Sequence, residues 1–278
     1  MLRIIKIFSL IIAIVMLIIT CNKIYRQNKY MKRSFQEIKS ELSKIQRFEN
    51  PRLELSREEL LETTYTDKKT VLTLYQMMKD VHEIFEKRDI IYWTSGGVSL
   101  GILRHKGLIP WDHDIDINIL HSDELKLQDL KTELESLGYY LNQDTFMYRI
   151  SLKDNVFDQA IRASHPFLEV YIMRKDTIDN KYIYTHEMMR EFYPKEYYYE
   201  DKLFPLKKYL FGNVYIWGPS DLEWYVTHYY GNDWNEIARL YPSRGNVQNL
   251  GNILLDFNLT EKSRQPAQPM GPLENRVK

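Results

Sequence analysis

The hydrophobic pattern divides the chain into an apolar start, a charged segment and a long mixed body. Residues 4–21 are almost continuously apolar and contain one charged residue, Lys6. A helix of about 18 residues rises about 27 Å, which matches a thin bilayer. Ile18 and Ile19 are bulkier than the residues that precede a signal-peptidase site. We therefore expect residues 1–22 to form a transmembrane signal anchor, with a cleaved signal peptide as the alternative.

Residues 23–65 are rich in charge and predict a helical stem. One narrow apolar stripe recurs there at helical spacing and consists of Phe35, Ile38, Leu42 and Ile45. Asn50 and Pro51 end this helix, and the segment Ser56 to Glu59 has the form of a capping box that opens a new one. A solvated spacer is the alternative interpretation of the stem.

The body opens with a predicted helix, a strand and a glycine pair. Seven apolar residues share one face of a helix from Asp67 to about Lys87, namely Val71, Leu74, Met77, Met78, Val81, Ile84 and Phe85. A β-rich run at Ile90–Thr94 leads into Ser95–Gly97 and then into an apolar helical turn at Val98–Leu103. This order suits phosphate binding, because glycines admit an anion and a helix N-terminus carries partial positive charge. An ordinary turn is the alternative.

Three aspartates alternate with other residues in the next segment. Asp112, Asp114 and Asp116 share one face of a predicted strand, because successive side chains of a strand point to opposite sides. The core face of this strand carries Ile115, Ile117 and Ile119. Like charges in a row repel, and a divalent cation resolves the repulsion. Oxygen ligands favour Mg²⁺ or Mn²⁺. An exposed acidic strand edge is the alternative.

Charged residues on both sides of the acidic strand extend this candidate site. Glu169 lies in the apolar run His165–Met173, where a buried carboxylate requires a cation or a position facing the site. Arg104, His105 and Lys106 come just before the acidic strand and would neutralise phosphate oxygens. A structural salt bridge of Glu169 and a solvated basic turn are the alternatives.

Composition narrows the class of function. The chain has 278 residues, with 38 Lys plus Arg and 38 Asp plus Glu, so its formal net charge is zero. Nucleic-acid binding is not expected without an excess of cations. An apolar fraction of 44% is sufficient for one main folded domain. The single cysteine, Cys21, excludes an intramolecular disulfide and a zinc cluster of thiolates.

A longer signature surrounds the acidic strand. It consists of Tyr92-Trp93, Gly96-Gly97, Leu100-Gly101, Arg104–Gly107, Ile109–Asp112 and Asp114–Asp116, followed by Phe204–Gly212, Pro219–Asp221 and Tyr230–Trp234. This signature resembles the LicD family, which includes fukutin and fukutin-related protein. The resemblance covers residues 66–257, which we expect to form the catalytic domain. The chain lacks the cysteines that give fukutin-related protein a zinc-binding element. Residues 258–278 contain several prolines and predict a flexible tail.

The resemblance implies a fold and an activity. The fold would be α+β, with a nucleotidyltransferase-like mixed β-sheet flanked by helices, preceded here by the transmembrane helix and the stem. Members of the family are thought to move a phosphorylated alcohol, such as phosphocholine or ribitol or glycerol phosphate. The donor would be CDP-linked and the acceptor would be a glycan hydroxyl.

The resemblance also implies roles for individual residues. Asp114 and Asp116 would bind the metal, and Glu169 would be a third ligand or the base that takes the acceptor proton. Asp112 would support these ligands from behind. Contacts to the substrate phosphates would come from Gly96, Gly97, Arg104, His105, Lys106 and Lys208.

Two other classes of protein also fit an anchored chain with a stem. A metal-dependent Asp-x-Asp glycosyltransferase is one, although the 48 positions between Thr66 and Asp114 are few for its nucleotide-binding half. A non-catalytic anchored protein that binds a glycan or nucleotide is the other. The stem and the resemblance favour a lumenal body in the Golgi or endoplasmic reticulum, whereas the basic residues after the anchor favour a cytoplasmic one. The sequence does not indicate an oligomeric state.

Overall fold

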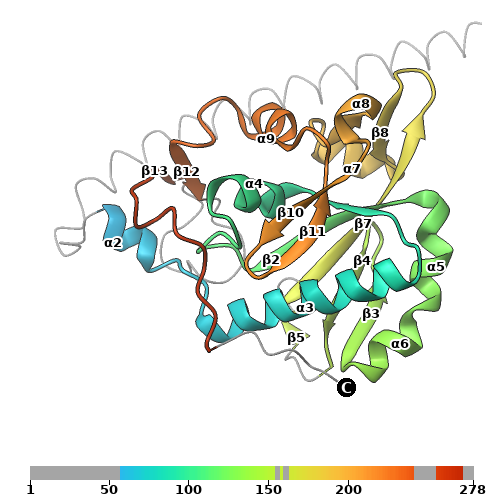
Figure 1. Ribbon diagram of the computed structural model, residues 1–278, viewed down its shortest axis with the longest axis horizontal. Coiled ribbons are helices and arrows are strands. Elements are labelled where there is room, and N and C mark those ends of the chain that lie inside the picture. The colour runs from blue at the N-terminus through green and yellow to red at the C-terminus, as the bar shows by residue number, and fades with distance from the viewer. Residues whose placement is uncertain (1–56, 154–156, 159–162, 241–254, 272–278) are drawn as a thin grey trace, which may run out of the picture. The chain divides into compact units, whose positions relative to one another are not determined.

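The computed structural model describes residues 57–153, 157–158, 163–240 and 255–271 (Figure 1). These residues belong to one folded unit, Ser56–Lys278. The expected anchor and nearly all of the expected stem lie outside the described residues. Within the described ranges, no helix is long and apolar enough to cross a bilayer.

A mixed sheet of seven strands forms the centre of this unit. Its strands follow the order β1-β2-β7-β4-β3, and β8 pairs with both β7 and β9. Only β2 and β7 run parallel among these pairs. The strands are β1 (Tyr92–Thr94), β2 (Asp114–Leu120), β3 (Tyr139–Gln143), β4 (Tyr148–Leu152), β7 (Phe167–Asp176), β8 (Lys181–Tyr184) and β9 (Tyr197–Tyr199). The expected α+β class with a mixed sheet is confirmed.

Helices flank the sheet, as predicted. Helix α3 packs against β2 and β7 and crosses in front of the sheet in Figure 1, while α4 packs against β2 and α9. The described helices are α2 (Arg57–Glu62), α3 (Lys68–Lys87), α4 (Gly96–Arg104), α5 (Glu124–Asp129), α6 (Lys131–Ser136), α7 (Glu187–Phe192), α8 (Glu200–Leu203) and α9 (Leu222–Tyr230), with a 3₁₀ turn η1 (His121–Asp123).

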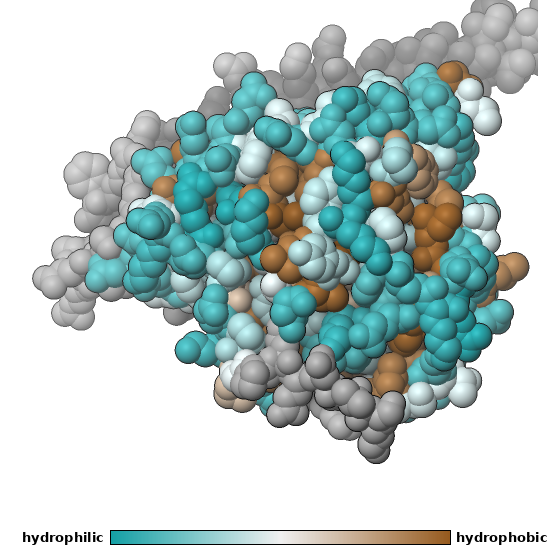
Figure 2. All heavy atoms as spheres, in the orientation of Figure 1, coloured by the Kyte–Doolittle hydropathy of each residue, from teal (hydrophilic) through white to brown (hydrophobic). Residues whose placement is uncertain are grey.

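Three further antiparallel pairs lie outside the central sheet. They are β5 (Phe157–Asp158) with β6 (Ala163–Ser164), β10 (Lys207–Phe211) with β11 (Val214–Gly218), and β12 (Ile237–Leu240) with β13 (Leu255–Asn258). The β10–β11 hairpin packs beside β1. On the face shown in Figure 2, hydrophilic residues cover most of the surface and hydrophobic residues show in patches between them.

Helix α3 begins and packs as its sequence predicts. The carboxylate of Asp67 accepts hydrogen bonds from the N–H groups of Lys69 and Thr70, each at 3.0 Å, and so caps the helix. All seven apolar residues of the predicted face are buried. The helix therefore covers the sheet with one apolar face and leaves its polar face to solvent.

Strand β2 is buried on the side opposite the aspartates. Ile115, Ile117 and Ile119 are fully buried, which confirms their predicted core positions. The strand lies between β1 and β7, so its backbone is paired on both edges. A rigid central strand therefore presents the carboxylates.

The chain after β13 packs against the body. The N–H of Ala267 donates to the carbonyl of Leu108 at 2.8 Å, and Ala267 is buried. Ser263 is also buried and its carbonyl lies 3.2 Å from Nε2 of His105. The segment 258–271 of the expected tail thus contacts the folded unit, and residues 272–278 lie outside the described residues.

Candidate metal and phosphate site

Three neighbouring strands bring two acidic residues and one basic residue into a row. Asp116 on β2 lies beside Glu169 on β7 in the parallel pair, and Arg149 on β4 lies beside Glu169 from the other edge. Paired positions on neighbouring strands point to the same face of a sheet. Asp114 precedes Asp116 by two residues and therefore shares that face.

A cavity of about 530 Å³ opens where these side chains lie. Its lining consists of Asp114, Asp116, Asp144, Phe146, Met147, Arg149, Glu169, Tyr171, Met189, Phe192 and Tyr193. The structure thus brings together the three residues that the sequence analysis assigned to metal binding and catalysis. They come from strands separated by about 50 residues of chain, so only the parallel pairing of β2 with β7 unites them.

Another part of the cavity wall is apolar and aromatic. Phe146 and Met147 come from the turn between β3 and β4, whereas Met189, Phe192 and Tyr193 come from α7 and its C-terminal end. The rings of Phe146 and Phe192 are nearly perpendicular, with centroids 6.5 Å apart. The sequence analysis did not find this wall, because neither segment carries a motif.

The glycine pair lies directly against the aspartates. A Cβ at Gly97 would come within 2.1 Å of Oδ2 of Asp112, and a Cβ at Gly96 within 2.8 Å of Oδ2 of Asp116. Gly96 also has a φ of +48°, which favours glycine. Its N–H donates to the hydroxyl of Tyr225 at 2.8 Å. The glycines therefore admit the carboxylates, and their contact with phosphate stays a prediction.

The carboxylates interact unfavourably with one another. Burial and then the charge of Asp114 raise the pKa of Asp112 well above its ordinary value. The same two causes, followed by the charge of Glu169, raise the pKa of Asp116. A cation at this position would remove the repulsion.

A group of three ligands suitable for such a cation lies just where β2 begins. The strand starts at Asp114, so Asp112 precedes it and does not lie on the strand as predicted. Asp112, His113 and Asp114 each offer one ligand atom, and these atoms lie within 4.8 Å of one another. Nε2 of His113 is buried and has no hydrogen-bond partner among the described residues. A buried ring nitrogen without a partner is costly unless a ligand occupies it. The residues present therefore fit a divalent metal, and Asp114 belongs both to this group and to the cavity lining.

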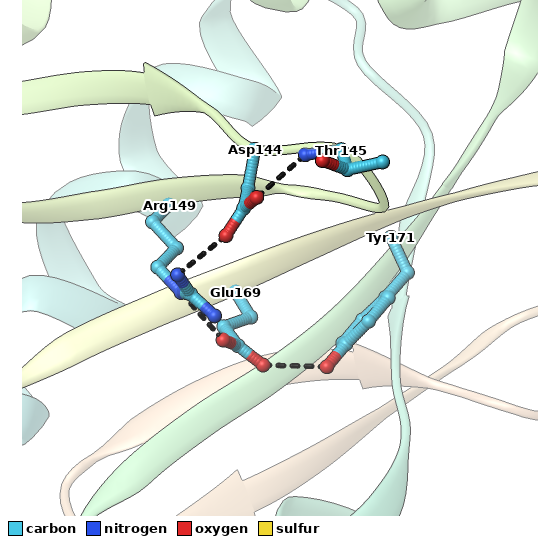
Figure 3. A network of polar contacts seen from close by, with 5 residues as sticks. All are labelled: Asp144, Thr145, Arg149, Glu169 and Tyr171. Atoms are coloured by element: carbon cyan, nitrogen blue, oxygen red, sulfur yellow. Dashed lines mark hydrogen bonds and ion pairs between the residues drawn. The ribbon is translucent and has the colours of Figure 1, made fainter. Parts of the chain in front are cut away.

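Both oxygens of Glu169 already have protein partners (Figure 3). Nε of Arg149 donates to Oε1 at 2.7 Å, and the hydroxyl of Tyr171 donates to Oε2 at 2.5 Å. Nη1 of Arg149 also donates to Oδ2 of Asp144 at 2.8 Å, and Oδ1 of Asp144 accepts from the N–H of Thr145. This network fixes Glu169 and connects it to the turn between β3 and β4.

Arg104 and His105, which the sequence analysis assigned to phosphate, do not line the cavity. The guanidinium of Arg104 is buried and donates to the carbonyls of Trp234, at 2.9 Å, and Ile237. Burial and the nearby charge of Arg104 lower the pKa of His105 to about 3, so its imidazole is neutral at neutral pH. Both side chains contact the C-terminal part of the chain.

Lys106 and Lys208 also lie outside the cavity lining. Nζ of Lys106 donates to the carbonyl of Leu103 at 3.1 Å, and Lys208 pairs with Glu86 at 3.1 Å. Among the described residues that line the cavity, Arg149 is the one cationic side chain.

A buried polar network supports the glycine pair from behind. Glu196 is buried and accepts hydrogen bonds from the hydroxyls of Tyr198, at 2.8 Å, and Tyr225, at 2.7 Å. Asn118 of β2 donates to the hydroxyl of Tyr198, and Tyr225 in turn accepts from Gly96. Burial raises the pKa of Glu196 to about 7.

Of the two residues that bind Glu169, the spacing along the sequence places Tyr171 but not Arg149. Tyr171 follows Glu169 by two residues in a predicted strand, so the period of two already placed it on the same face. Arg149 lies 20 residues before Glu169, and only the pairing of β4 with β7 brings it there.

Comparison with known proteins identifies the same family that the sequence signature resembles. Residues 89–221 match the nucleotidyltransferase domain described as LicD/FKTN/FKRP. An uncharacterized protein of Rickettsia prowazekii is 40% identical over 212 residues, which are 75% of this chain and 74% of that protein.

Two relatives with named activities are more distant. The lipopolysaccharide cholinephosphotransferase LicD of Haemophilus influenzae is 28% identical over 115 residues, or 37% of this chain and 42% of that protein. The human ribitol 5-phosphate transferase FKRP is 25% identical over 126 residues, or 42% of this chain and 25% of that protein. The chain therefore spans less than half the length of each of these two relatives.

Gly97→Ala should weaken metal binding more than it weakens folding. The new Cβ would displace the carboxylate of Asp112, a side-chain atom that can rotate away. Displacing a group that orients metal ligands typically costs about 10- to 100-fold in affinity. Titration with Mn²⁺ followed by electron paramagnetic resonance measures this loss.

Gly138→Ala is the matched control for this substitution. Gly138 has a φ of +88°, and a Cβ added there would meet no heavy atom within 4 Å. Alanine at this position should therefore cost on the order of 1 kcal/mol of stability without changing Mn²⁺ affinity. Equal Mn²⁺ affinities of both variants and the wild type would show that Gly97 does not position Asp112.

Glu196→Gln should flatten the pH dependence of stability. The native pKa of about 7 exceeds the ordinary value near 4.3, so between these two pH values the native state binds more protons than the unfolded state. The contribution of Glu196 to stability therefore falls as pH rises through this window, by about 3 to 4 kcal/mol. Glutamine has no charge to bury, so the variant should be more stable than the wild type at pH 8.

Urea unfolding in EDTA at pH 5, 6, 7 and 8 measures this difference. Glu83→Gln, at an exposed position of α3, is the control and should keep the wild-type slope. If Glu196→Gln and the wild type give parallel curves, the carboxyl group of Glu196 does not ionise in this range.

Proposed function

Because the chain belongs to the family of LicD, fukutin and fukutin-related protein, we propose that it is a metal-dependent transferase that moves a phosphorylated alcohol from a CDP-linked donor to a glycan hydroxyl. The names of the relatives support a transferase of this type. The observation that carries the proposal is the cavity in which Asp114, Asp116 and Glu169 converge from two parallel strands. Such a group of carboxylates is suited to a metal-bound diphosphate.

The proposed reaction exchanges one phosphorus–oxygen bond for another. The acceptor hydroxyl oxygen forms a bond to the phosphorus that carries the alcohol, and the bond from that phosphorus to the bridging oxygen breaks. CMP leaves with the electrons of the broken bond, and the acceptor proton passes to a base. The protein mainly positions the reacting groups and offsets their charge.

Asp114 and Asp116 are the proposed metal ligands, with Glu169 as a third ligand or as the base. The hydrogen bonds to Glu169 leave other lone pairs of its oxygens for a ligand. Asp112 and His113 extend the donor set. A bound Mg²⁺ or Mn²⁺ would neutralise the diphosphate and activate its phosphorus. Mn²⁺ is the better probe, because imidazole ligands favour transition metals over Mg²⁺.

The cavity wall favours a cationic alcohol over a polyol. Phe146, Phe192 and Tyr193 offer aromatic rings, and the carboxylate-rich lining carries an excess of negative charge. Aromatic faces attract quaternary ammonium groups. The described lining contains no serine, threonine, asparagine or glutamine side chain, so only its tyrosine hydroxyls and charged groups could bind the hydroxyls of a polyol. We therefore propose a phosphocholine-like group rather than ribitol phosphate.

We also propose that residues 1–22 anchor the protein in a membrane and that the body is lumenal. The apolar segment and the family resemblance support both proposals. Protease protection of a C-terminally tagged chain in microsomes distinguishes a lumenal body from a cytoplasmic one.

Asp114→Asn and Asp116→Asn should each abolish CMP release while the domain remains folded. Each substitution removes a ligand but also removes like-charge repulsion, so stability without metal should hold or rise. Stabilisation by Mn²⁺ should disappear. Thermal melting with and without Mn²⁺ and a CMP-release assay measure these effects.

Asp129→Asn, at an exposed position of α5, is the control and should behave as the wild type. Normal CMP release by either cavity variant at saturating Mg²⁺ and Mn²⁺ would contradict the assignment of that aspartate as a metal ligand.

CDP-choline should bind more tightly than CDP-ribitol and UDP-glucose when Mn²⁺ is present. Phe146→Leu keeps an apolar side chain but removes one ring, so it should weaken CDP-choline binding by about 5- to 30-fold. Its effect on CDP-ribitol should be small. Isothermal titration of the three donors against the wild type and this variant makes the comparison.

Each contrary result has a defined meaning. Preference for CDP-ribitol would support the proposed transferase activity but contradict the proposal that the transferred alcohol is cationic. Preference for UDP-glucose with release of UDP would favour the glycosyltransferase alternative. Nucleotide binding without turnover of any donor would favour the non-catalytic binding protein.

A further inference from the structure

We propose that Arg149 binds the phosphate of the donor and uses the same guanidinium group to hold Glu169 beside it. This inference rests on the proposed function, because it assigns a residue to the phosphate of that site. Arg149 is not among the motif and signature residues that the sequence analysis named.

The position of Arg149 supports this role. It lies on β4 directly beside Glu169 of β7, in the row of side chains that faces the cavity. Figure 3 shows its guanidinium between the carboxylates of Glu169 and Asp144. The carbon Cζ lies 5.2 Å from the centre of the Phe167 ring, which is itself buried. Packing and two ion pairs therefore fix the guanidinium at the cavity wall.

Arg149 keeps unused hydrogen-bonding capacity. A guanidinium has five N–H groups, and the hydrogen bonds to Glu169 and Asp144 engage one on Nε and one on Nη1. The other three have no acceptor among the described residues. Arginine binds phosphate oxygens through pairs of such N–H groups, which a lysine cannot reproduce.

The charge of the cavity requires a cation of this kind. Asp114, Asp116, Asp144 and Glu169 line the cavity, and Arg149 is their cationic counterpart among the described lining residues. A diphosphate would add further negative charge to this group. Three cationic residues that the sequence analysis assigned to phosphate, Arg104, Lys106 and Lys208, bind carbonyls or another carboxylate outside the cavity lining. Arg149 therefore meets the need that those residues leave unmet.

A purely structural ion pair is the competing explanation, and Arg149→Lys separates the two. Lysine keeps a positive charge near Glu169 and so should preserve folding, but it lacks the planar guanidinium group with its paired N–H donors. With saturating Mn²⁺, the full chain carrying Arg149→Lys should bind inorganic pyrophosphate about 10- to 100-fold more weakly than the wild type. Its Mn²⁺ affinity and melting temperature should stay close to those of the wild type.

Arg88→Lys is the matched control. Arg88 forms an ion pair with Glu133 outside the cavity, in which Nε of Arg88 donates to Oε2 at 2.9 Å, so its variant should bind pyrophosphate normally. Arg149→Met serves as a second variant, and its melting curve shows whether loss of pyrophosphate binding comes from unfolding. Titration calorimetry with Mn²⁺ and then with pyrophosphate supplies both affinities.

The outcomes separate this inference from the proposed function. Unchanged pyrophosphate affinity in Arg149→Lys, an equal loss of Mn²⁺ and pyrophosphate affinity, or no pyrophosphate binding by the wild type would each overturn the phosphate role. Selective loss of pyrophosphate binding in a protein that releases no CMP would support the phosphate role of Arg149 and contradict the proposed transferase activity. Equal CMP release by the wild type and Arg149→Lys would support the transferase activity and contradict the phosphate role of Arg149.

Discussion

Repulsion between carboxylates on one face of the parallel pair β2–β7 is the constraint on which the site depends. Asp116 and Glu169 occupy paired positions, and Asp114 lies one step along the same face. Such a group is unfavourable without cations: burial and then the charge of Asp114 raise the pKa of Asp116. The sheet tolerates it because β2 is paired on both edges and carries the buried side chains of Ile115, Ile117 and Ile119 on its opposite face.

The surrounding residues either admit this charge or offset it. Gly96 and Gly97 lack the Cβ atoms that would collide with the aspartates. Arg149 neutralises Glu169 from the adjacent strand, and Tyr171 donates to its other oxygen. The Glu196 network reaches the glycine turn through Tyr225. Elements that look unrelated in the sequence therefore serve the same group of carboxylates.

The charged and the aromatic side chains of the cavity come from different elements. Strands β2, β4 and β7 carry the charged side chains, and a central sheet holds such groups rigidly. The turn between β3 and β4 and the short helix α7 carry the aromatic wall. Under the proposed function, changes in the turn and helix would alter the alcohol that is accepted without moving the proposed metal ligands. The two named relatives, a cholinephosphotransferase and a ribitol 5-phosphate transferase, differ in the alcohol of their names.

Local patterns in the sequence determined much of the fold and part of the site. The apolar face of α3, the alternation along β2 and the aspartates with their glycine pair follow from residues close together in the chain, where periodicity and steric demand act. The sequence did not place Arg149, whose role depends on the pairing of β4 with β7. It also assigned phosphate to Arg104 and Lys208. Tertiary packing places these side chains against Trp234 and Glu86, outside the described cavity lining, and their contact with phosphate stays a prediction. A charge in the sequence shows only that a group is available, whereas strand pairing and packing between distant segments decide which partner it meets.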